Sequence, residues 1–356
     1  MHGYATQALL FSTGNNWNTT PSRDGSTGWT EAVVNLSAVP APKLRIGVQA
    51  RYFLLGDYGN AITLDWAQAD YKFNERIGIR AGKVKSPVGM LNEIQDVDPA
   101  YLWILLPQSV YPLASRTTLL SHFGGVVYGS VPLGESFGKI KYRLWGGERR
   151  VPSQDGSFEP LRDNGLSFPN GLTSRVGGLT FRWVTPIPGL TAGANASREN
   201  PRGAVQVTQV GLQGEFSAKH LHPYTLFVSY ERKRAFVGGE YNRTTSNPTI
   251  AFTGFPARPG KVDQRSFYVM ASYKLTEKLT GGVYYSSSIN TGIPVSSARF
   301  QKDWTISARY DATPFLYLKA EEHVLDGTEI GFSTSNNARG LQADSRLALL
   351  KLGVTF

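Results

Sequence analysis

Apolar and polar residues alternate along most of this 356-residue chain, and this period of two limits the possible folds more than any other feature. Within residues 43–52, Leu44 and Ile46 fall on one face, whereas Arg45 and Arg51 fall on the other. Successive side chains of a β-strand point to opposite faces of the sheet. The segment therefore predicts a strand with one apolar face and one basic face.

The same alternation recurs throughout the chain and predicts an all-β protein of sixteen strands, each about ten residues long. The apolar parity switches near residues 66–68 and 207–210, which predicts two β-bulges. No linker interrupts the strands, so residues 1–356 are expected to form one domain. The predicted strands are residues 4–13, 28–38, 43–53, 60–73, 76–86, 118–131, 138–148, 173–184, 189–197, 205–217, 222–233, 263–275, 279–288, 302–311, 315–324 and 346–356.

The connections between these strands differ in length according to strand order. Short connections follow the even-numbered strands, whereas long connections follow most odd-numbered ones. Outer-membrane barrels have an even number of antiparallel strands, with short turns at one end and long loops at the other. The pattern therefore predicts a 16-stranded antiparallel transmembrane β-barrel of the bacterial outer membrane. The long connections are residues 14–27, 87–117, 149–172, 234–262, 289–301 and 325–345, and residues 54–59 and 198–204 are short exceptions.

Strands, and not helices, are the elements that could span a membrane. The longest apolar runs, such as residues 101–106, are far shorter than the roughly 20 residues of a spanning helix. A closed barrel pairs every backbone N–H and C=O group, as lipid requires. Aromatic residues near the strand ends predict two interfacial girdles. They are Tyr71, Phe73, Trp183, Tyr273 and Tyr310 at the end with short connections, and Trp29, Tyr52 and Trp304 at the other end.

Composition excludes several other classes of protein. The chain has no cysteine, so it can form neither disulfides nor thiolate metal sites. The formal net charge is +10, but the basic residues do not cluster, and no nucleic-acid partner is predicted. The chain opens on mature-looking sequence, so we expect any secretory signal to have been removed.

The polar faces of the strands are expected to line a water-filled interior. Eight strands make a barrel that side chains fill, whereas sixteen leave a channel. An Arg or Lys on the lipid face at mid-membrane would cost about 2–4 kcal/mol, which favours an inward orientation. The basic positions assigned to the interior are Arg45, Arg51, Arg76, Arg80, Lys139, Lys141, Arg143, Arg182, Arg309, Lys319 and Lys351.

The third connection at the end with long loops, residues 87–117, is too long and too apolar for an ordinary exposed loop. Its apolar run 101–106 would promote aggregation in water. We therefore expect this third loop to fold inward and pack against the wall, where its acidic residues would face wall cations. The predicted constriction combines the loop acids Glu93, Asp96 and Asp98 with the wall residues Arg45, Arg51, Arg76, Arg80, Lys85, Lys139, Lys141 and Arg143.

Opposed charges across a narrow pore produce a transverse field, and an excess of cations favours anions. The sequence thus predicts a passive diffusion channel for small hydrophilic, preferentially anionic solutes, with no cofactor, no metal and no catalytic residue. Two plainer interpretations stay open. The inward cations could be solvated wall residues balanced by acids such as Asp65 and Glu321. Asp96 and Asp98 could cap turns or hold a cation such as Ca²⁺.

The architecture and the terminal aromatic Phe356 resemble those of the trimeric Gram-negative porins across the whole chain. Within that group, the segment Arg80-Ala-Gly-Lys-Val-Lys-Ser-Pro-Val-Gly89 resembles the R-x-G-x-x-K-x-P-x-G segment of the phosphate-selective porin O/P-like proteins. The resemblance implies a homotrimer in contact with outer-membrane lipid and lipopolysaccharide, with the third loop as the constriction. Phosphate selectivity is not carried over, because the phosphate-binding positions cannot be aligned.

Two functions of other classes are alternatives to the channel. The first is an outer-membrane barrel enzyme of lipase or protease type, because residues 134–138 match G-x-S-x-G around Ser136. A nucleophile elbow requires a strand–turn–helix context, whereas this match falls in a predicted turn between strands. The second alternative is a structural or adhesive barrel whose long connections 234–262 and 325–345 bind a partner.

Overall fold

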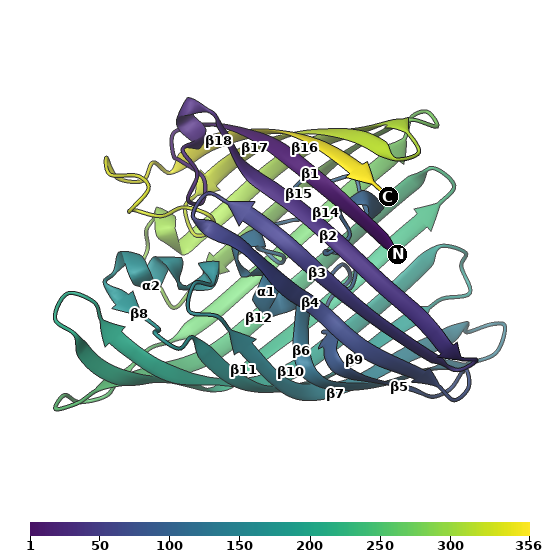
Figure 1. The fold of residues 1–356 in the computed structure, drawn as a ribbon, viewed down its shortest axis with the longest axis horizontal. Coiled ribbons are helices and arrows are strands. Elements are labelled where there is room, and N and C mark those ends of the chain that lie inside the picture. Colours follow the sequence, from purple (N-terminus) through teal and green to yellow (C-terminus); the bar gives the residue numbers. More distant parts are fainter.

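The computed structural model describes the backbone of residues 1–356 and all side chains except those of Thr117, Lys219, His220 and Leu221. One sheet contains eighteen strands, of which β8 and β13 have two residues each (Figure 1). The strands are β1 His2–Thr13, β2 Ser26–Ala41, β3 Leu44–Leu55, β4 Tyr58–Lys72, β5 Gly78–Lys85, β6 Ser121–Pro132, β7 Lys139–Val151, β8 Leu166–Ser167, β9 Leu172–Val184, β10 Leu190–Val207, β11 Leu212–Arg232, β12 Ala235–Phe252, β13 Arg258–Pro259, β14 Val262–Lys274, β15 Leu279–Asn290, β16 Phe300–Thr313, β17 Leu316–Gly327 and β18 Asp344–Thr355.

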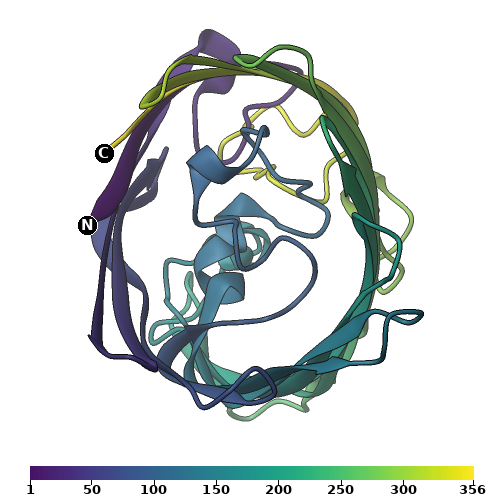
Figure 2. The same ribbon diagram turned by 90° about the vertical axis from the view of Figure 1, so that its right-hand side faces the viewer.

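The sheet closes on itself, because β1 pairs antiparallel with both β2 and β18. Figure 2 shows the resulting ring of strands, with the two chain ends side by side in its wall. Closure leaves no strand edge with unpaired backbone groups, which is the condition for a sheet in lipid. The predicted closed, antiparallel barrel with sixteen long strands is confirmed.

Helical elements are few and short. No helix in the part of the chain that the structure describes is long and apolar enough to cross a membrane. The two α-helices are α1 Arg116–Leu120 and α2 Glu159–Asp163, and the 3₁₀ turns are η1 Ser22–Asp24, η2 Asp98–Ala100, η3 Leu113–Ser115, η4 Gly156–Phe158 and η5 Ser297–Arg299.

The connections lie in two sets at opposite ends of the barrel. At one end they are short, at residues 42–43, 73–77, 133–138, 185–189, 233–234, 275–278 and 314–315. At the other end they are mostly long, at residues 14–25, 86–120, 152–171, 253–261, 291–299 and 328–343. Two connections at this second end, residues 56–57 and 208–211, are short.

The predicted strand boundaries are wrong between residues 205 and 262. Residues 205–207 of the predicted strand 205–217 belong to β10. The rest of that strand from residue 212 on joins the predicted strand 222–233 in one strand, β11, and the predicted loop 234–262 contains the long strand β12. Strands β10, β11 and β12 are the longest of the sheet, with 18, 21 and 18 residues. The sequence of β12 is rich in Gly, Asn, Ser and Thr, a composition typical of loops, so it did not indicate a strand.

Of the two predicted bulges, one is close to an observed irregularity. Gln49 pairs with Trp66, whereas the next residue, Ala50, pairs with Leu64, so Asp65 is the extra residue in β4. The bulge predicted near residues 207–210 is wrong, because β10 ends at 207 and the chain turns there into β11.

Large apolar side chains are exposed on the outer face of the strands. Leu144, Phe181, Val269, Ile306 and Leu350 are each more than two-fifths exposed, and their sequence neighbours on the opposite face are less exposed. Most of the predicted girdle residues belong to this outer face. The exposed aromatic residues of the two girdles are Tyr71, Phe73, Trp183, Tyr273, Tyr310 and Trp304.

One girdle assignment is wrong. Trp29 is only 1% exposed and packs inside the barrel against Trp17, with ring centroids 6.2 Å apart. The ammonium group of Lys351 lies 4.2 Å from its ring centroid. A cation held over an indole face in this way belongs to the interior and not to a lipid interface.

The segment between β5 and β6, residues 86–120, lies inside the ring of strands (Figure 2). Its apolar run Leu102–Leu106 is buried. Leu102, Trp103 and Leu106 share a cluster with Met270 and Tyr284 of the barrel wall. Burial against the wall explains how so apolar a connection can occur in a barrel with a polar interior.

Candidate functional site

Glu93, on the inner segment, is shared by two arginines of the barrel wall. Its Oε1 lies 3.2 Å from Nη1 of Arg80 on β5, and its Oε2 lies 2.8 Å from Nη2 of Arg143 on β7. Arg80 also pairs through Nε with Asp70 of β4 at 2.9 Å. The side chains of Glu93, Arg80 and Arg143 are each about one-quarter to one-fifth exposed, at 26%, 21% and 21%, so this group of charges faces water.

Asp96 makes a second and more deeply buried contact between the segment and the wall. Lys85 Nζ lies 2.7 Å from its carboxylate, and the side chain of Asp96 is fully buried. Gln49 Nε2 and Trp66 Nε1 donate to its Oδ2 at 2.9 and 3.0 Å. Three wall donors on β3, β4 and β5 therefore satisfy this one carboxylate.

Asp98 lies between two lysines of the last two strands. Its carboxylate lies 3.0 Å from Lys319 Nζ of β17 and 2.8 Å from Lys351 Nζ of β18, and Tyr317 Oη donates to it at 2.7 Å. Burial alone would raise the pKa of the Asp98 carboxyl. The two ammonium groups and the hydroxyl outweigh burial and hold that pKa well below its usual range.

The structure therefore brings the three loop acids to cations, but not all to the predicted ones. Lys319 and Lys351, which pair with Asp98, were assigned to the interior and not to the constriction. Arg51 is only 2% exposed and pairs with Glu31 of β2 at 2.6 Å, so it lies away from open water.

Four other predicted wall cations are exposed near the end with short connections. Arg45, Arg76, Lys139 and Lys141 form no salt bridge among the residues that the structure describes. Lys141 pairs across the sheet with Arg182 of β9. Positive charge without an acidic partner thus collects on β3, β7 and β9 and on the connection before β5.

Glu321, an acid of the wall that was not predicted as a site residue, holds the inner segment through its backbone. Glu321 of β17 accepts from the N–H groups of Ile104 and Leu105, both at 2.8 Å. His323 is placed between two carboxylates, with Nε2 3.0 Å from Glu321 and Nδ1 3.0 Å from Asp303. Because both ring nitrogens face carboxylate oxygens, the imidazole must be doubly protonated to donate to both.

Glu240 of β12 holds the beginning and the end of the segment together. Its Oε2 accepts from Tyr111 Oη at 2.7 Å, from Tyr268 Oη at 2.8 Å and from the N–H of Met90 at 3.2 Å. At the far end, Arg116 of α1 makes a bidentate pair with Asp65 at 3.1 and 2.9 Å. Sequence alone could not identify Glu321, because it is one acidic residue among many on alternating strands. Glu240 was missed because it falls in the predicted loop 234–262.

Replacing Gly89 by alanine is expected to displace the start of the inner segment. Gly89 has φ = +61°, and a Cβ there would meet the Glu240 carboxylate and would lie 2.5 Å from Tyr111 Oη. Single-channel recordings should show a less steady open level than in the wild type. Gly134→Ala is the matched control, because Gly134 also has positive φ (+93°) but has nothing within 4 Å of its Cβ.

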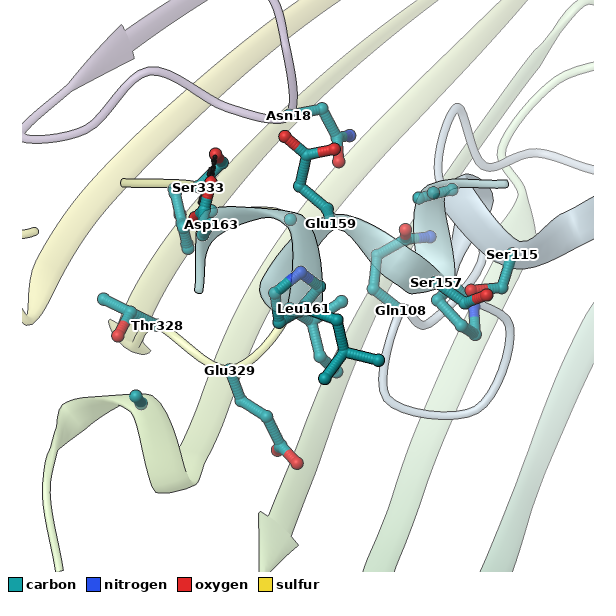
Figure 3. A pocket seen from close by; sticks show the side chains of 18 of the residues that line it. Asn18, Gln108, Ser115, Ser157, Glu159, Leu161, Asp163, Thr328, Glu329 and Ser333 are labelled. Atoms are coloured by element: carbon teal, nitrogen blue, oxygen red, sulfur yellow. Dashed lines mark hydrogen bonds between the residues drawn. The ribbon is translucent and has the colours of Figure 1, made fainter. Parts of the chain in front are cut away.

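The long connections enclose a cavity of about 740 Å³ above the segment (Figure 3). Asp163 of α2 bridges two connections here, because it accepts from Ser333 Oγ at 2.9 Å and from the N–H of Thr334 at 2.6 Å. Glu329 also lines the cavity, and its Oε1 accepts from Gln264 Nε2 at 3.2 Å. Burial raises the pKa of Glu329 to about 7.

This pKa predicts that ion selectivity changes near neutral pH. Below pH 7 the Glu329 carboxyl is protonated and neutral; above pH 7 it adds a negative charge to the outer cavity. Reversal potentials should therefore shift toward weaker anion preference as the pH rises through about 7. Glu329→Gln should remove this change in reversal potential. If the variant shows a change of the same size, another titrating group causes it.

Among the described residues, no group of three or more His, Asp or Glu side chains is arranged to hold a metal ion. Ser136, in the G-x-S-x-G match, is exposed in the connection between β6 and β7. A strand and not a helix follows it, so the context of a nucleophile elbow is missing.

No protein-family model and no curated protein sequence matches the chain. Solved outer-membrane structures do match its fold. The outer-membrane-expressed OmpT of Vibrio cholerae has a TM-score of 0.60 and 12% identity over 99% of this chain and 97% of its own. OmpF of Salmonella typhi, in a complex with daunomycin, has a TM-score of 0.59 and 12% identity over 100% and 96%. The anion-selective porin from Comamonas acidovorans has a TM-score of 0.57 and 11% identity over 100% and 98%.

Proposed function

We propose that this chain is a diffusion channel that passes small hydrophilic solutes across the bacterial outer membrane and favours anions. The closed sixteen-stranded barrel is the fold of the outer-membrane porins, and its outward face is apolar. The observation that carries the proposal is the group of exposed cations at the end with short connections, which have no acidic partner within 4.0 Å among the described residues. A barrel of this strand number leaves room for water, and charged side chains lining that water would set the selectivity.

The anion preference rests on the unpaired cations more than on the ion-paired ones. Arg80 and Arg143 face two carboxylates, Glu93 and Asp70, so this group is close to neutral. The excess positive charge comes from Arg45, Arg76, Lys139 and Lys141, together with Arg182. These side chains lie toward the end with short connections, below the inner segment, and would raise the local concentration of anions there.

The inner segment would act as the constriction, as predicted for residues 87–117. Its contacts with Glu240, Glu321, Asp65, Lys319 and Lys351 fix both ends and the middle of the segment to the wall. A segment held at so many points would narrow the pore without moving freely. The field across it would run from Glu93 to the arginines of β5 and β7.

The segment Arg80–Gly89 supports a relationship to the phosphate-selective porin O/P-like group. Lys85 pairs with Asp96 of the inner segment, and the carbonyl oxygen of Pro87 accepts from Thr180 of the wall. Gly82 and Gly89 have φ values of +125° and +61°, which favour glycine. Every fixed position of the motif thus has a structural task at the entry of the inner segment, where the family would place its third loop.

A homotrimer in contact with lipopolysaccharide is part of the same proposal. One structure with the same fold is an in-vitro folded OmpT of Vibrio cholerae described as a trimer form, with a TM-score of 0.57. Light scattering of the purified protein, corrected for bound detergent, would give the number of chains in the particle. A mass of one chain would remove the trimer from the proposal and leave the channel intact.

Reversal potentials in a salt gradient across a planar bilayer test the selectivity. The wild type is expected to show a chloride preference. Changing Arg76, Lys139 and Lys141 together to glutamine should reduce this preference, because three exposed cations are removed from the end with short connections. Lys302→Gln is the matched control, because Lys302 is half-exposed and pairs with Asp326 away from this group. A potassium preference in the wild type would refute the anion bias.

A further inference from the structure

A second cavity, of about 420 Å³, adjoins the first one above the inner segment and shares lining residues such as Ser115 and Gln264 with it. Its walls are the two ends of the segment and the inner faces of β10, β11, β12 and β14. Volumes of this size are typical of sites that hold small organic molecules. Most of its polar lining is side-chain amide and hydroxyl: Asn195, Ser197, Thr225, Asn242, Thr244 and Ser266.

The charged residues in this lining already contact protein groups through part of their polar atoms. Arg149 of β7 pairs with Glu199 of β10. Glu240 uses its Oε2 to accept from two tyrosine hydroxyls and one backbone N–H. An ion that entered would exchange its hydration shell for neutral dipoles, so this cavity differs in kind from the basic wall below the segment.

Two buried atoms of the lining lack a hydrogen-bond partner among the described residues. They are Nε of Arg149, a donor, and Oε1 of Glu240, an acceptor. The two residues are only 5% and 4% exposed, so neither atom is satisfied by bulk water. A buried unsatisfied group in a native site calls for a water or ligand that completes it.

The amide and hydroxyl groups between these atoms can also both donate and accept. Asn195 uses its Oδ1 to accept from the N–H of Gly89 at 2.7 Å, which leaves its Nδ2 amide as the group it can offer to the cavity. Thr225 Oγ1 accepts from Asn242 Nδ2 at 3.0 Å and can donate its own hydrogen.

We propose that this cavity is a binding subsite for a neutral polyhydroxylated solute of the size of a small sugar. A hydroxyl group is both donor and acceptor, so one chemical group complements the unpaired donor, the unpaired acceptor and the neutral lining between them. The proposal rests on the proposed channel function, and it adds a neutral subsite on the outer side of the segment to the cationic wall on the inner side.

Ion-current recordings with sucrose in one chamber test the subsite. Sucrose is expected to interrupt the wild-type current in a saturable way. Thr225→Val together with Asn242→Leu should weaken its apparent affinity about tenfold, the effect of two lost hydrogen bonds. Ser272→Ala, in the lining of the cavity below the segment, is the matched control and should leave the affinity unchanged.

Charged sugar derivatives test whether the cavity prefers neutral solutes to ions. Gluconate and glucosamine should interrupt the current more weakly than sucrose at equal concentration. If either of them binds more tightly than sucrose and loses affinity in the double variant, the cavity is an ion site and the proposal is wrong. Sucrose binding that the double variant leaves unchanged also overturns it.

The subsite proposal and the channel proposal can be refuted independently of each other. Saturation-transfer NMR of sucrose with the detergent-solubilised protein measures binding without any current. A transfer signal that the double variant reduces supports the subsite even if bilayers show no conductance, in which case only the channel function fails. Steady conductance with no transfer signal and no current interruption refutes the subsite alone.

Discussion

Replacing Asp98 by asparagine is expected to lower the free energy of unfolding of the barrel by about 3–5 kcal/mol, the range for breaking a buried ion pair. Lys319 and Lys351 have 0% and 1% of their side chains exposed, and this one carboxylate is the anionic partner that both ammonium groups share. Without it, Lys319 keeps the carbonyl oxygens of residues 98 and 103, and Lys351 keeps the face of Trp29. Dipoles and an aromatic face compensate an ammonium group less well than a carboxylate does.

Urea titration of the refolded protein in lipid vesicles measures this loss. Asp57→Asn, in the exposed connection between β3 and β4, is the matched control and should change little. Combining Asp98→Asn with Lys319→Met and Lys351→Met should restore most of the stability, because no buried charge is then left alone. An Asp98→Asn barrel as stable as the wild type would show that water reaches these lysines.

Replacing Glu321 by alanine is expected to free the middle of the inner segment. The N–H groups of Ile104 and Leu105 would lose their acceptor, and the His323 imidazolium would keep only one of its two carboxylates. A buried group left unsatisfied costs about 1–3 kcal/mol, and more when it is charged. The open-state current should become noisy, with sublevels, because the segment no longer has one position.

Glu322→Ala provides the comparison on the same strand. Glu322 lies next in sequence, so its side chain points to the opposite face of β17, and no contact with the inner segment depends on it. The Glu322→Ala channel should therefore show the same steady current as the wild type. Equal noise in both variants would indicate a general weakening of the wall, and a quiet Glu321→Ala channel would show that other contacts suffice to hold the segment.

The period of two and the order of connection lengths were enough to predict the closed barrel, because lipid on one face and water on the other impose both patterns on the strands. The prediction failed at β11, where residues 218–221 were predicted to be a turn, and at β12, whose many Gly, Asn, Ser and Thr residues are typical of a loop. It also failed at Trp29, because a strand-end aromatic residue on either face gives the same sequence signal.

The sequence predicted which types of residue meet in the candidate site, but it did not predict every pair of residues. Acids on an inward loop were expected to meet basic wall residues, and Glu93, Asp96 and Asp98 do contact such residues. The partner of Asp98 could not be predicted, because β17 and β18 reach the loop only through closure of the sheet. Glu321 was missed for the same reason, since its role depends on a segment more than a hundred residues away.

Single-channel recording of the purified wild-type protein in a planar bilayer tests the central claim most directly. The account predicts discrete, long-lived conductance steps in symmetric salt, because water passes a segment that is fixed to the wall. A folded, membrane-inserted barrel that gives no steps at any voltage would contradict it, since the inner segment would then close the barrel completely.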